Sequence, residues 1–245
     1  HSIEQMVSFS KKIHLQGQTI GFVPTMGALH EGHLTLIRQA RKENDIVVVS
    51  IFVNPIQFGP KEDYKRYPQD LKFDAQLCRR EGTDVVFFPD LRSMYPTNYK
   101  TYIEVCDLSN VLCGKFRPGH FRGVVTVVTK LFNIVRPDIA YFGQKDAQQA
   151  IIIEKMVCDL NMPLTIKIMP TVREKDGLAL SSRNTYLNHN ERKEAKVLYQ
   201  ALNLARHLIR QGNLDPLDII RKMRQLINRG KSATVQYISI VDLED

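Results

Sequence analysis

Short apolar runs recur along the first two thirds of the chain, each bounded by polar or turn-forming residues. They occupy residues 19–23, 46–53, 85–88, 139–142 and 164–169. The runs are nearly continuous and rich in β-branched residues, which is typical of parallel strands buried on both faces. Segments with helical character occupy residues 33–42, 71–81, 123–135 and 147–161. This alternation predicts an α/β fold with a Rossmann-like, doubly wound parallel sheet.

The pattern changes after residue 170. Residues 191–211 place apolar side chains on one face of a long helix, and a second helix is expected at 216–228. Residues 235–241 alternate as in an edge or half-buried strand. We therefore expect two domains, a Rossmann-like domain over residues 1–170 and a smaller α+β domain over residues 171–245. Because a lone strand is not stable by itself, we expect the second domain to be truncated.

Composition and net charge limit the kinds of molecule that the protein is expected to bind. The 245 residues carry a formal net charge of +8, which favours anionic partners. Because the basic residues are scattered rather than clustered, we expect small phosphorylated ligands and no nucleic acid. No apolar run approaches the roughly 20 residues that span a bilayer, and no signal peptide is visible. Four cysteines without zinc-ligand spacing predict reduced thiols. Together these features predict a cytoplasmic protein with no membrane partner.

The sequence PTMGALHEGH at 24–33 directly follows the first predicted strand. Gly27 permits a tight turn, and Gly32 removes a side chain where a ligand would approach. His30 and His33, three residues apart, can share one face where a helix begins, and free N–H groups there favour phosphate oxygens. Such a histidine can donate a hydrogen bond to charge that builds on a phosphate during nucleotidyl transfer. The alternative is two incidental histidines near a turn; HExxH zinc-peptidase spacing is absent.

The sequence FVNPIQF at 52–58 ends the second predicted strand with two amides, Asn54 and Gln57. Amide groups donate to and accept from hydroxyl and carboxylate groups without requiring a counter-ion. Both segments lie at carboxyl ends of predicted strands, where ligands bind in such sheets, so we expect them to share one site. The alternative for Asn54 and Gln57 is a structural turn.

A third segment, YFGQKDAQQ at 141–149, again leaves a strand and enters a helix. Lys145 is a suitable point charge for a phosphate. Asp146 can accept from ribose hydroxyls or can simply cap the helix. Gln149 lies one turn into the helix, where its amide can face the site.

Two later loops are also rich in phosphate-binding side chains. The sequence LSSRN at 180–184 offers the hydroxyl groups of Ser181 and Ser182 and the guanidinium of Arg183, although a serine there can instead cap a helix. The sequence RPGHFRG at 117–123 is basic and contains glycine. It fits a mobile lid and a solvated turn equally well.

These segments, in this order, closely resemble the pantothenate synthetase (pantoate–β-alanine ligase) family. That family belongs to the nucleotidyltransferase superfamily with the HxGH and KMSKS-like signatures of class I aminoacyl-tRNA synthetases. The resemblance runs from about residue 20 to 187 and is carried by the strings PTMGxLHxGH, FVNPxQF, RPGHFxGV, FGxKDxQQ and DGLAxSSRN. Coincidence across five such strings is implausible.

The resemblance implies a two-step reaction. ATP first adenylates the carboxylate of pantoate and releases pyrophosphate; β-alanine then attacks the acyl-adenylate to give pantothenate and AMP. The resemblance further implies Mg²⁺ on the triphosphate, a homodimer, and a second domain that closes as a lid. No residue identifies itself as a dedicated metal ligand, so the metal site is unknown.

The resemblance also assigns residues. Catalytic roles fall to His33, His30, Lys145 and Arg183, with His33 as the proton donor. The ATP site comprises Pro24, Thr25, Met26, Gly27, His30, Gly32, His33, Gly143, Lys145, Asp146, Val172, Leu180, Ser181, Ser182 and Arg183. Substrate contacts are expected at Gln57 and Gln149 for pantoate, with Asn54 and Met26 beside them, and Gln57 also serves β-alanine. LSSR replaces the KMSKS signature of the wider superfamily, so Lys145 is expected to supply the missing cation.

Two other functions fit parts of the sequence. The first is another adenylyltransferase of the superfamily, which would consume a phosphate monoester, whereas Gln57 and Gln149 favour a carboxylate. The second is a non-catalytic nucleotide- or RNA-binding module derived from a synthetase. The joint presence of His33, Lys145 and Arg183 argues against lost catalysis, and the scattered basic residues argue against RNA.

Overall fold

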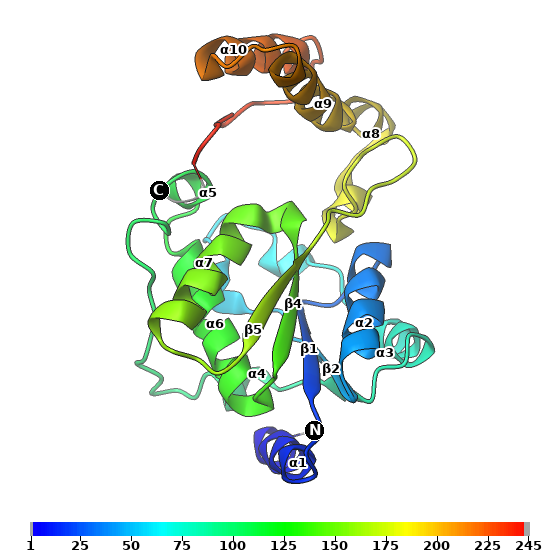
Figure 1. Cartoon of the computed structure of the whole chain (residues 1–245), viewed down its shortest axis with the longest axis vertical. Helices are drawn as coiled ribbons and strands as arrows, with labels where there is room; N and C mark the ends of the chain where they lie inside the picture. The colour runs from blue at the N-terminus through cyan, green and yellow to red at the C-terminus, as the bar shows by residue number, and fades with distance from the viewer. Residues whose placement is uncertain (1, 243–245) are drawn as a thin grey trace. The chain divides into compact units, whose positions relative to one another are not determined.

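The computed structural model describes residues 2–242, and the chain divides into two compact units, His1–Val172 and Arg173–Asp245. The first unit is built on a five-stranded sheet with the order β3-β2-β1-β4-β5, in which every pairing is parallel (Figure 1). The strands are β1 Ile20–Thr25, β2 Ile46–Ile51, β3 Val85–Phe87, β4 Ile139–Gly143 and β5 Thr165–Met169. The predicted α/β fold with a parallel sheet is confirmed.

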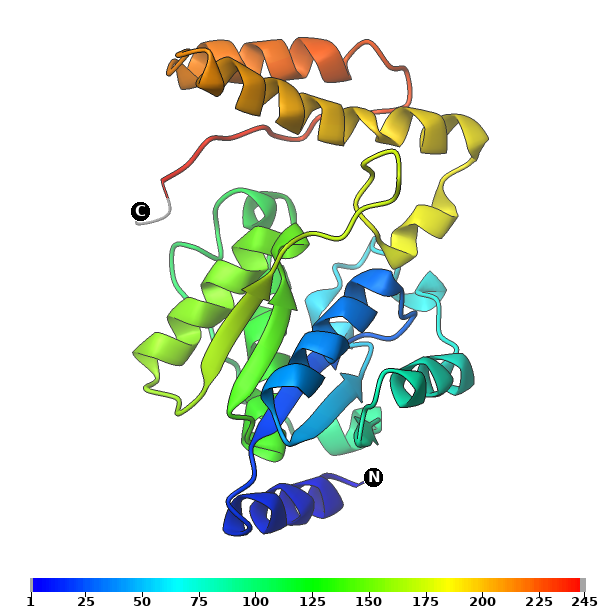
Figure 2. The same cartoon turned by 45° about the vertical axis from the view of Figure 1, so that its right-hand side comes forward.

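Helices cover both faces of this sheet. Figures 1 and 2 show α6 and α7 on one face and α2 and α3 on the other. The helices of the first unit are α1 Ile3–Leu15, α2 Glu31–Glu43, α3 Leu71–Arg80, α4 Leu91–Met94, α5 Cys113–Phe116, α6 His120–Val135 and α7 Ala147–Asp159. No helix within residues 2–242 is long and apolar enough to cross a membrane.

Adjacent strand residues face opposite layers, which explains why the apolar runs are continuous. Phe22 and Val48 are fully buried in the cluster that contains α1, α6 and α7. Val23 and Val49 are fully buried in the cluster that contains α2 and α3. Because successive side chains of a strand point to opposite faces, a strand covered on both sides needs apolar residues at every position.

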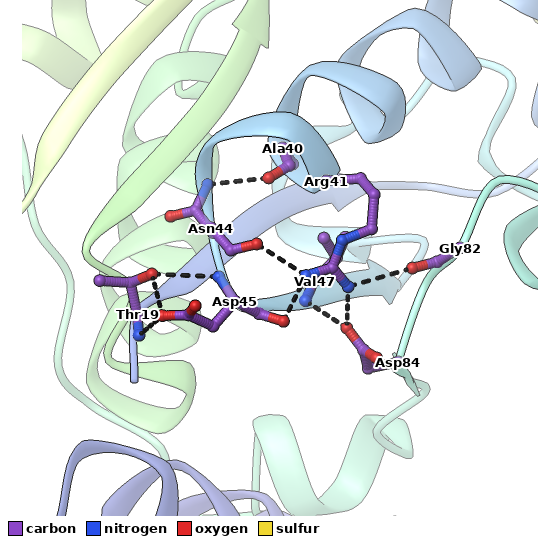
Figure 3. A network of polar contacts seen from close by, with 8 residues as sticks. All are labelled: Thr19, Ala40, Arg41, Asn44, Asp45, Val47, Gly82 and Asp84. Carbon is purple, nitrogen blue, oxygen red and sulfur yellow. Dashed lines mark hydrogen bonds and ion pairs between the residues drawn. The ribbon is translucent and has the colours of Figure 1, made fainter. Parts of the chain in front are cut away.

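A polar network closes the amino edge of the sheet, away from the ends of the strands where the candidate motifs lie (Figure 3). Arg41, near the end of α2, donates to the backbone carbonyl oxygen of Asn44 at 2.6 Å and to the carboxylate of Asp84 at 2.6 Å. Asp84 also accepts from the backbone N–H of Val47, at the start of β2, at 2.7 Å. These contacts tie α2 to the amino ends of β2 and β3.

The second unit differs from the sequence prediction in two respects. The helix expected over residues 191–211 is divided into α8 His189–Ala195 and α9 Val197–Arg210. The helix expected at 216–228 is confirmed as α10 Pro216–Ile227. The strand expected at 235–241 is not formed, so the described part of this unit is helical, with one isolated antiparallel bridge between Arg173 and Ala179. An alternating segment becomes a strand only when a partner strand supplies its hydrogen bonds, and residues 173–242 offer none to it.

Candidate active site

The centre of the sheet brings two of the predicted segments together. β1 lies between β2 and β4, so the strand order reverses between β1 and β4. The pairing of β1 with β4 covers only Gly21 and Phe22, which leaves the last residues of β1 free to diverge from β4. Open α/β sheets bind ligands at the carboxyl ends of the strands beside such a reversal of strand order. The histidine motif leaves β1 here, and the segment that contains Lys145 leaves β4.

A tight turn joins β1 to α2. Gly27 has φ +82° and Ala28 has φ +50°, so both lie in the left-handed region. As predicted, glycine relieves the strain at position 27. The hydroxyl of Thr25 accepts from the backbone N–H of Gly27 at 3.2 Å and donates to the carbonyl of Ser50 at 2.8 Å. Thr25 therefore ties the turn to the end of β2.

Asp74 stabilises the same turn from α3, and the sequence analysis missed it. Its two carboxylate oxygens accept from the backbone N–H groups of Ala28 at 2.9 Å and Leu29 at 2.8 Å. Burial raises the pKa of Asp74, while the two N–H groups act in the opposite direction. Nothing in the local sequence distinguishes this carboxylate from a solvated one, because its partners lie more than 40 residues away.

The imidazole rings of the two histidines pack against each other in a tilted arrangement at the start of α2. Their ring centroids lie 4.1 Å apart, with an angle of 37° between the ring planes. The backbone N–H of His30 donates to Nδ1 of His33 at 3.2 Å. Because Nδ1 accepts, the neutral His33 ring carries its proton on Nε2. His33 can therefore offer an Nε2–H donor.

Gly32 also leaves room for a neighbouring side chain. A Cβ atom at this position would lie 2.9 Å from Cε1 and 3.0 Å from Nδ1 of His30. The glycine thus makes room for the imidazole of His30. The ring of His30 can therefore pack against the ring of His33.

Burial and neighbouring positive charge keep both rings neutral. Desolvation lowers the pKa of His33 to about 3, and His30 and Lys145 add to this effect. Desolvation also lowers the pKa of His30, and the charge of Lys145 acts in the same direction. The charge of Lys145 thus acts on both rings of the pair, so the structure brings this predicted phosphate-binding cation to the histidine motif.

The segment after β4 continues into η3 Gln144–Asp146 and then α7. Lys145 Nζ lies 3.0 Å from a carboxylate oxygen of Asp146, and both side chains are exposed. Asp146 precedes α7, but its side chain makes no capping hydrogen bond, so the helix-capping alternative is not realised. Gln149 is half-buried in the first turn of α7, and Gly143 ends β4.

The two amides after β2 are locked together. Asn54, 1 % exposed, donates through Nδ2 to Oε1 of Gln57 and to the carbonyl oxygen of Gly123, both at 3.0 Å. Gln57 then donates through Nε2 to Sδ of Met26 at 3.1 Å. A Cβ atom on Gly123 would lie 2.6 Å from Cα of Gln57, so only glycine lets α6 approach η1 Pro55–Gln57 this closely. The amides are therefore far more constrained than those of a simple surface turn.

The 117–123 segment is anchored through Arg117 and His120, while Pro118 and Gly119 between them are exposed. Arg117 forms a two-pronged ion pair with Glu62, with N–O distances of 2.7 and 2.6 Å. Its guanidinium also donates to Nε2 of buried His120 at 2.9 Å, and His120 Nδ1 donates to the carbonyl oxygen of Gln57 at 2.8 Å. A cavity of about 270 Å³ lies beside Gln57 and His120.

The loop with the expected phosphate-binding residues lies in the second unit. Ser181 precedes η4 Ser182–Tyr186, and its hydroxyl accepts from the backbone N–H of Arg183 at 3.3 Å. The helix-capping role is therefore realised for Ser181. Leu180, Ser182 and Arg183 are half-buried, as is Val172, the last residue of the first unit.

A hairpin-like turn precedes this loop. A Cβ atom on Gly177, where φ is +93°, would lie 1.9 Å from the ring of Tyr199, so glycine is required there. The guanidinium of Arg173 lies 4.5 Å from the centre of the same ring. Arg192 forms ion pairs with Glu174 at 2.6 Å and Asp176 at 2.8 Å. These contacts hold the turn to the helices of the second unit.

The fold and the site define a nucleotide-dependent α/β enzyme with a histidine motif at the switch point of its parallel sheet. The protein-family model described as "Pantoate-beta-alanine ligase" matches residues 1–245 of the chain. The chain belongs to the pantoate–β-alanine ligase family, and the family and the enzymatic character predicted from the motifs are confirmed.

Two similar relatives are both named pantothenate synthetase, which agrees with this family assignment. The pantothenate synthetase of Caldicellulosiruptor saccharolyticus is 54% identical over 99% of this chain and 86% of its own length. That of Thermotoga neapolitana is 55% identical over 99% of this chain and 87% of its own length.

Solved structures agree as well. The pantothenate synthetase of Thermus thermophilus superposes with a TM-score of 0.94 at 45% identity, over 99% of this chain and 86% of that one. The pantoate–β-alanine ligase of Francisella tularensis, complexed with β,γ-ATP and β-alanine, has a TM-score of 0.83 at 39% identity, over 98% of this chain and 88% of that one.

Proposed function

We propose that this protein condenses pantoate with β-alanine in two steps. In the first, a pantoate carboxylate oxygen attacks the α-phosphorus of ATP, and pyrophosphate leaves. In the second, the amine of β-alanine attacks the acyl carbon of pantoyl-adenylate, so that an amide forms and AMP leaves. The observation that carries the proposal is the position of the histidine pair and of Lys145 at the switch point between β1 and β4.

His33 is assigned to the phosphate that reacts. Its pKa of about 3 makes it a neutral donor through Nε2 in the ligand-free protein, so a hydrogen bond to developing charge suits it better than delivery of a proton. Lys145 supplies positive charge to the triphosphate. His30 packs against His33, and its ring is placed by the space that Gly32 leaves.

The substrate acid is assigned to the amides. Gln57 presents Nε2 beside Met26, and Gln149 is assigned to contribute a second amide from the first turn of α7. An uncharged site suits a reaction in which an anionic acid and an amine bind in succession, since a fixed carboxylate would repel the acid. Gln57 serves both substrates in this proposal, and Asn54 holds it in place.

The remaining ATP contacts come from two sources. In the first unit they are the turn residues Pro24, Thr25, Met26 and Gly27, together with Gly143, Asp146 and the backbone of Val172. In the second unit, Leu180, Ser181, Ser182 and Arg183 are assigned to the phosphates. We propose that this unit, Arg173–Asp245, acts as a lid over the nucleotide-binding unit His1–Val172, which would exclude water from the acyl-adenylate.

Mg²⁺ is assigned to the triphosphate rather than to a protein cage. Among residues 2–242, no group of three or more His, Cys, Asp or Glu side chains could hold a metal ion. Mg²⁺ commonly keeps several waters and binds through phosphates and one or two carboxylates, so the triphosphate itself would supply its main ligands. The ion would neutralise charge on the triphosphate.

A homodimer in the cytoplasm completes the proposal. The four cysteines are free thiols in the described part of the chain, which fits a reducing compartment. The dimer follows from the family resemblance, and light scattering of the purified protein would give its mass.

Pantoate-dependent exchange of labelled pyrophosphate into ATP tests the first step, because it needs no β-alanine. AMP production that requires both pantoate and β-alanine tests the whole reaction. We expect exchange to require pantoate and to persist without β-alanine. Exchange supported by a phosphate monoester in place of pantoate would instead identify another adenylyltransferase.

A further inference from the structure

Tyr95 lies outside the motifs of the sequence, yet it contacts the amide pair. It follows α4, near the carboxyl end of β3, and is half-buried. Its phenolic hydroxyl donates to Oδ1 of Asn54 at 2.9 Å, across 41 residues of sequence. Burial raises the pKa of Tyr95, so the phenol keeps its proton and remains a donor.

This contact pairs the carbonyl oxygen of the Asn54 amide, whose NH₂ group has two other partners. With Oδ1 occupied by the phenol, both hydrogens of Nδ2 are directed to oxygen atoms, Oε1 of Gln57 and the carbonyl oxygen of Gly123. A flipped Asn54 amide would place its oxygen against the carbonyl oxygen of Gly123, which cannot donate. The carbonyl oxygen of Gly123 therefore fixes the orientation of the Asn54 amide. The phenolic O–H stabilises that orientation because it pairs with Oδ1 in a nearly inaccessible site, where unpaired polar groups are costly.

The orientation of the Asn54 amide determines the orientation of the Gln57 amide. Because its Oε1 accepts from Asn54, its Nε2 must face the other way, toward Sδ of Met26 at 3.1 Å. A thioether sulfur is a weak acceptor. A carboxylate or hydroxyl oxygen of a ligand can therefore replace it with a gain in hydrogen-bond strength.

We propose that Tyr95 is a positioning residue, whose hydroxyl orders the amides of Asn54 and Gln57 so that Gln57 presents N–H donors to the acid substrate. The proposal rests on the assignment of Gln57 to pantoate. Reversed amides would present a carbonyl oxygen to an anion instead, which is repulsive. We therefore expect Tyr95 to affect the binding of the acid substrate and not the binding of ATP.

A purely structural role for Tyr95 would depend on its ring. The ring lies 6.1 Å from that of Phe52 and 5.0 Å from that of Tyr99, and Lys130 Nζ lies 5.8 Å from its centre. These contacts survive in Tyr95→Phe, which removes only the hydroxyl. That substitution therefore separates the two roles.

The kinetic test uses the full chain in pantoate-dependent ATP–pyrophosphate exchange. We expect Tyr95→Phe to raise the KM for pantoate about tenfold, the effect of one lost buried hydrogen bond, and to leave the KM for ATP within about twofold. The matched control is Tyr99→Phe, which removes a phenol from the same aromatic cluster and should leave both constants unchanged. An equal change in both KM values, or none, would overturn the proposal.

Gln57→Ala links the effect to its target. In that background, Tyr95→Phe should have no further effect on the KM for pantoate, since the group that it orients is absent. If Gln57→Ala itself leaves the KM for pantoate unchanged, the assignment of pantoate to Gln57 fails. If Gln57→Ala raises it and Tyr95→Phe does not, only the role of Tyr95 fails.

A ligand-free measurement tests the relay without activity. In ¹⁵N NMR spectra, the side-chain NH₂ signals of Asn54 and Gln57 should shift or broaden in Tyr95→Phe and stay unchanged in Tyr99→Phe. Unchanged signals in Tyr95→Phe would refute the relay even if no substrate had been identified.

Discussion

Leu29 donates its backbone N–H to the carboxylate of Asp74 at 2.8 Å, although 45 residues separate the two along the chain. The second oxygen of the carboxylate accepts from Ala28 at 2.9 Å. Ala28 has φ +50°, in the left-handed region that non-glycine residues rarely adopt. A helix on one face of the sheet therefore stabilises the strained turn from which the histidine motif begins.

Asp74→Ala is expected to reduce the free energy of unfolding by about 1.5–3 kcal/mol, because it leaves two N–H groups without their charged acceptor. It should also raise the KM for ATP, because the turn before His30 is released. Urea unfolding and steady-state kinetics measure the two effects. Asp70→Ala is the control, since Asp70 caps the same helix through Phe73 at 3.0 Å without touching the turn. A KM for ATP close to that of wild type in Asp74→Ala would contradict this role.

The strands of the first unit could be predicted because burial on both faces makes each one a continuous apolar run. Helix α1 was missed, although Ser2 and Gln5 form a capping box at its start. That signal was present in the sequence and was not used. The division between α8 and α9 could not be predicted, because Lys196 retains helical dihedral angles and interrupts no apolar pattern. The strand expected at 235–241 depended on a partner, which local alternation cannot reveal.

His33→Ala should slow pantoate-dependent adenylation by about 10²–10⁴-fold, the usual contribution of a positioned acid–base or electrostatic group. The physical reason is loss of the Nε2–H donor whose orientation the backbone of His30 fixes. Initial rates of ATP–pyrophosphate exchange at saturating pantoate measure it. His14→Ala is the control, since His14 pairs with Asp138 at the amino edge of the sheet. A rate for His33→Ala close to that of wild type would remove His33 from its assigned role.

The same histidine makes stability depend on pH. Folded His33 has a pKa of about 3, whereas an unfolded histidine takes up its proton near 6.5. The unfolded state therefore binds more protons between pH 3 and 6.5, and stability falls as the pH drops through that range. Above pH 6.5 the effect is absent. The groups that act on the His33 ring are His30 and Lys145, and both disfavour its protonation.

His33→Asn removes this titration and keeps an acceptor for the N–H of His30. Its free energy of unfolding should change less steeply than that of wild type below the ordinary histidine pKa. The two slopes should differ by up to about 1.4 kcal/mol per pH unit. Urea unfolding of both proteins at intervals from about pH 4.5 to 7.5 gives the comparison. The other histidines with lowered pKa, His30 and His120, are present in both proteins. Parallel curves would show that His33 is not kept neutral by the fold.

The residue types at the site could be predicted, but the groups that orient them could not. Strand ends and helix starts identified His30, His33, Gln57 and Lys145, since each motif carries its own local signal. Their supports come from distant segments, and a carboxylate or a phenol in an ordinary helix or loop has no pattern that marks it as buried. Gly32 illustrates the limit, because the sequence showed that space was needed there but not that an imidazole fills it.

The ion pair between Glu62 and Arg117 should stabilise the fold at neutral pH and lose its effect in acid. The side-chain hydrogen bonds of Arg117 hold the pKa of Glu62 below its ordinary value of 4.5. Its contribution is therefore complete above pH 4.5 and disappears as the pH falls below that value. Glu62→Gln should cost about 1 kcal/mol near neutral pH, since the pair is partly buried and two-pronged, and progressively less as the pH falls through the lowered pKa of Glu62.

The matched control is Asp159→Asn, which breaks the exposed pair with Lys155 on α7 and should leave the free energy of unfolding almost unchanged. Hydrogen exchange gives a second measure of the same contact. Residues 58–66 should exchange faster in Glu62→Gln, because this segment loses its tie to Arg117, and through Arg117 to His120 and the carbonyl oxygen of Gln57. If residues 58–66 exchange equally fast in wild type and Glu62→Gln, and the two proteins are equally stable at neutral pH, Arg117 does not anchor the segment.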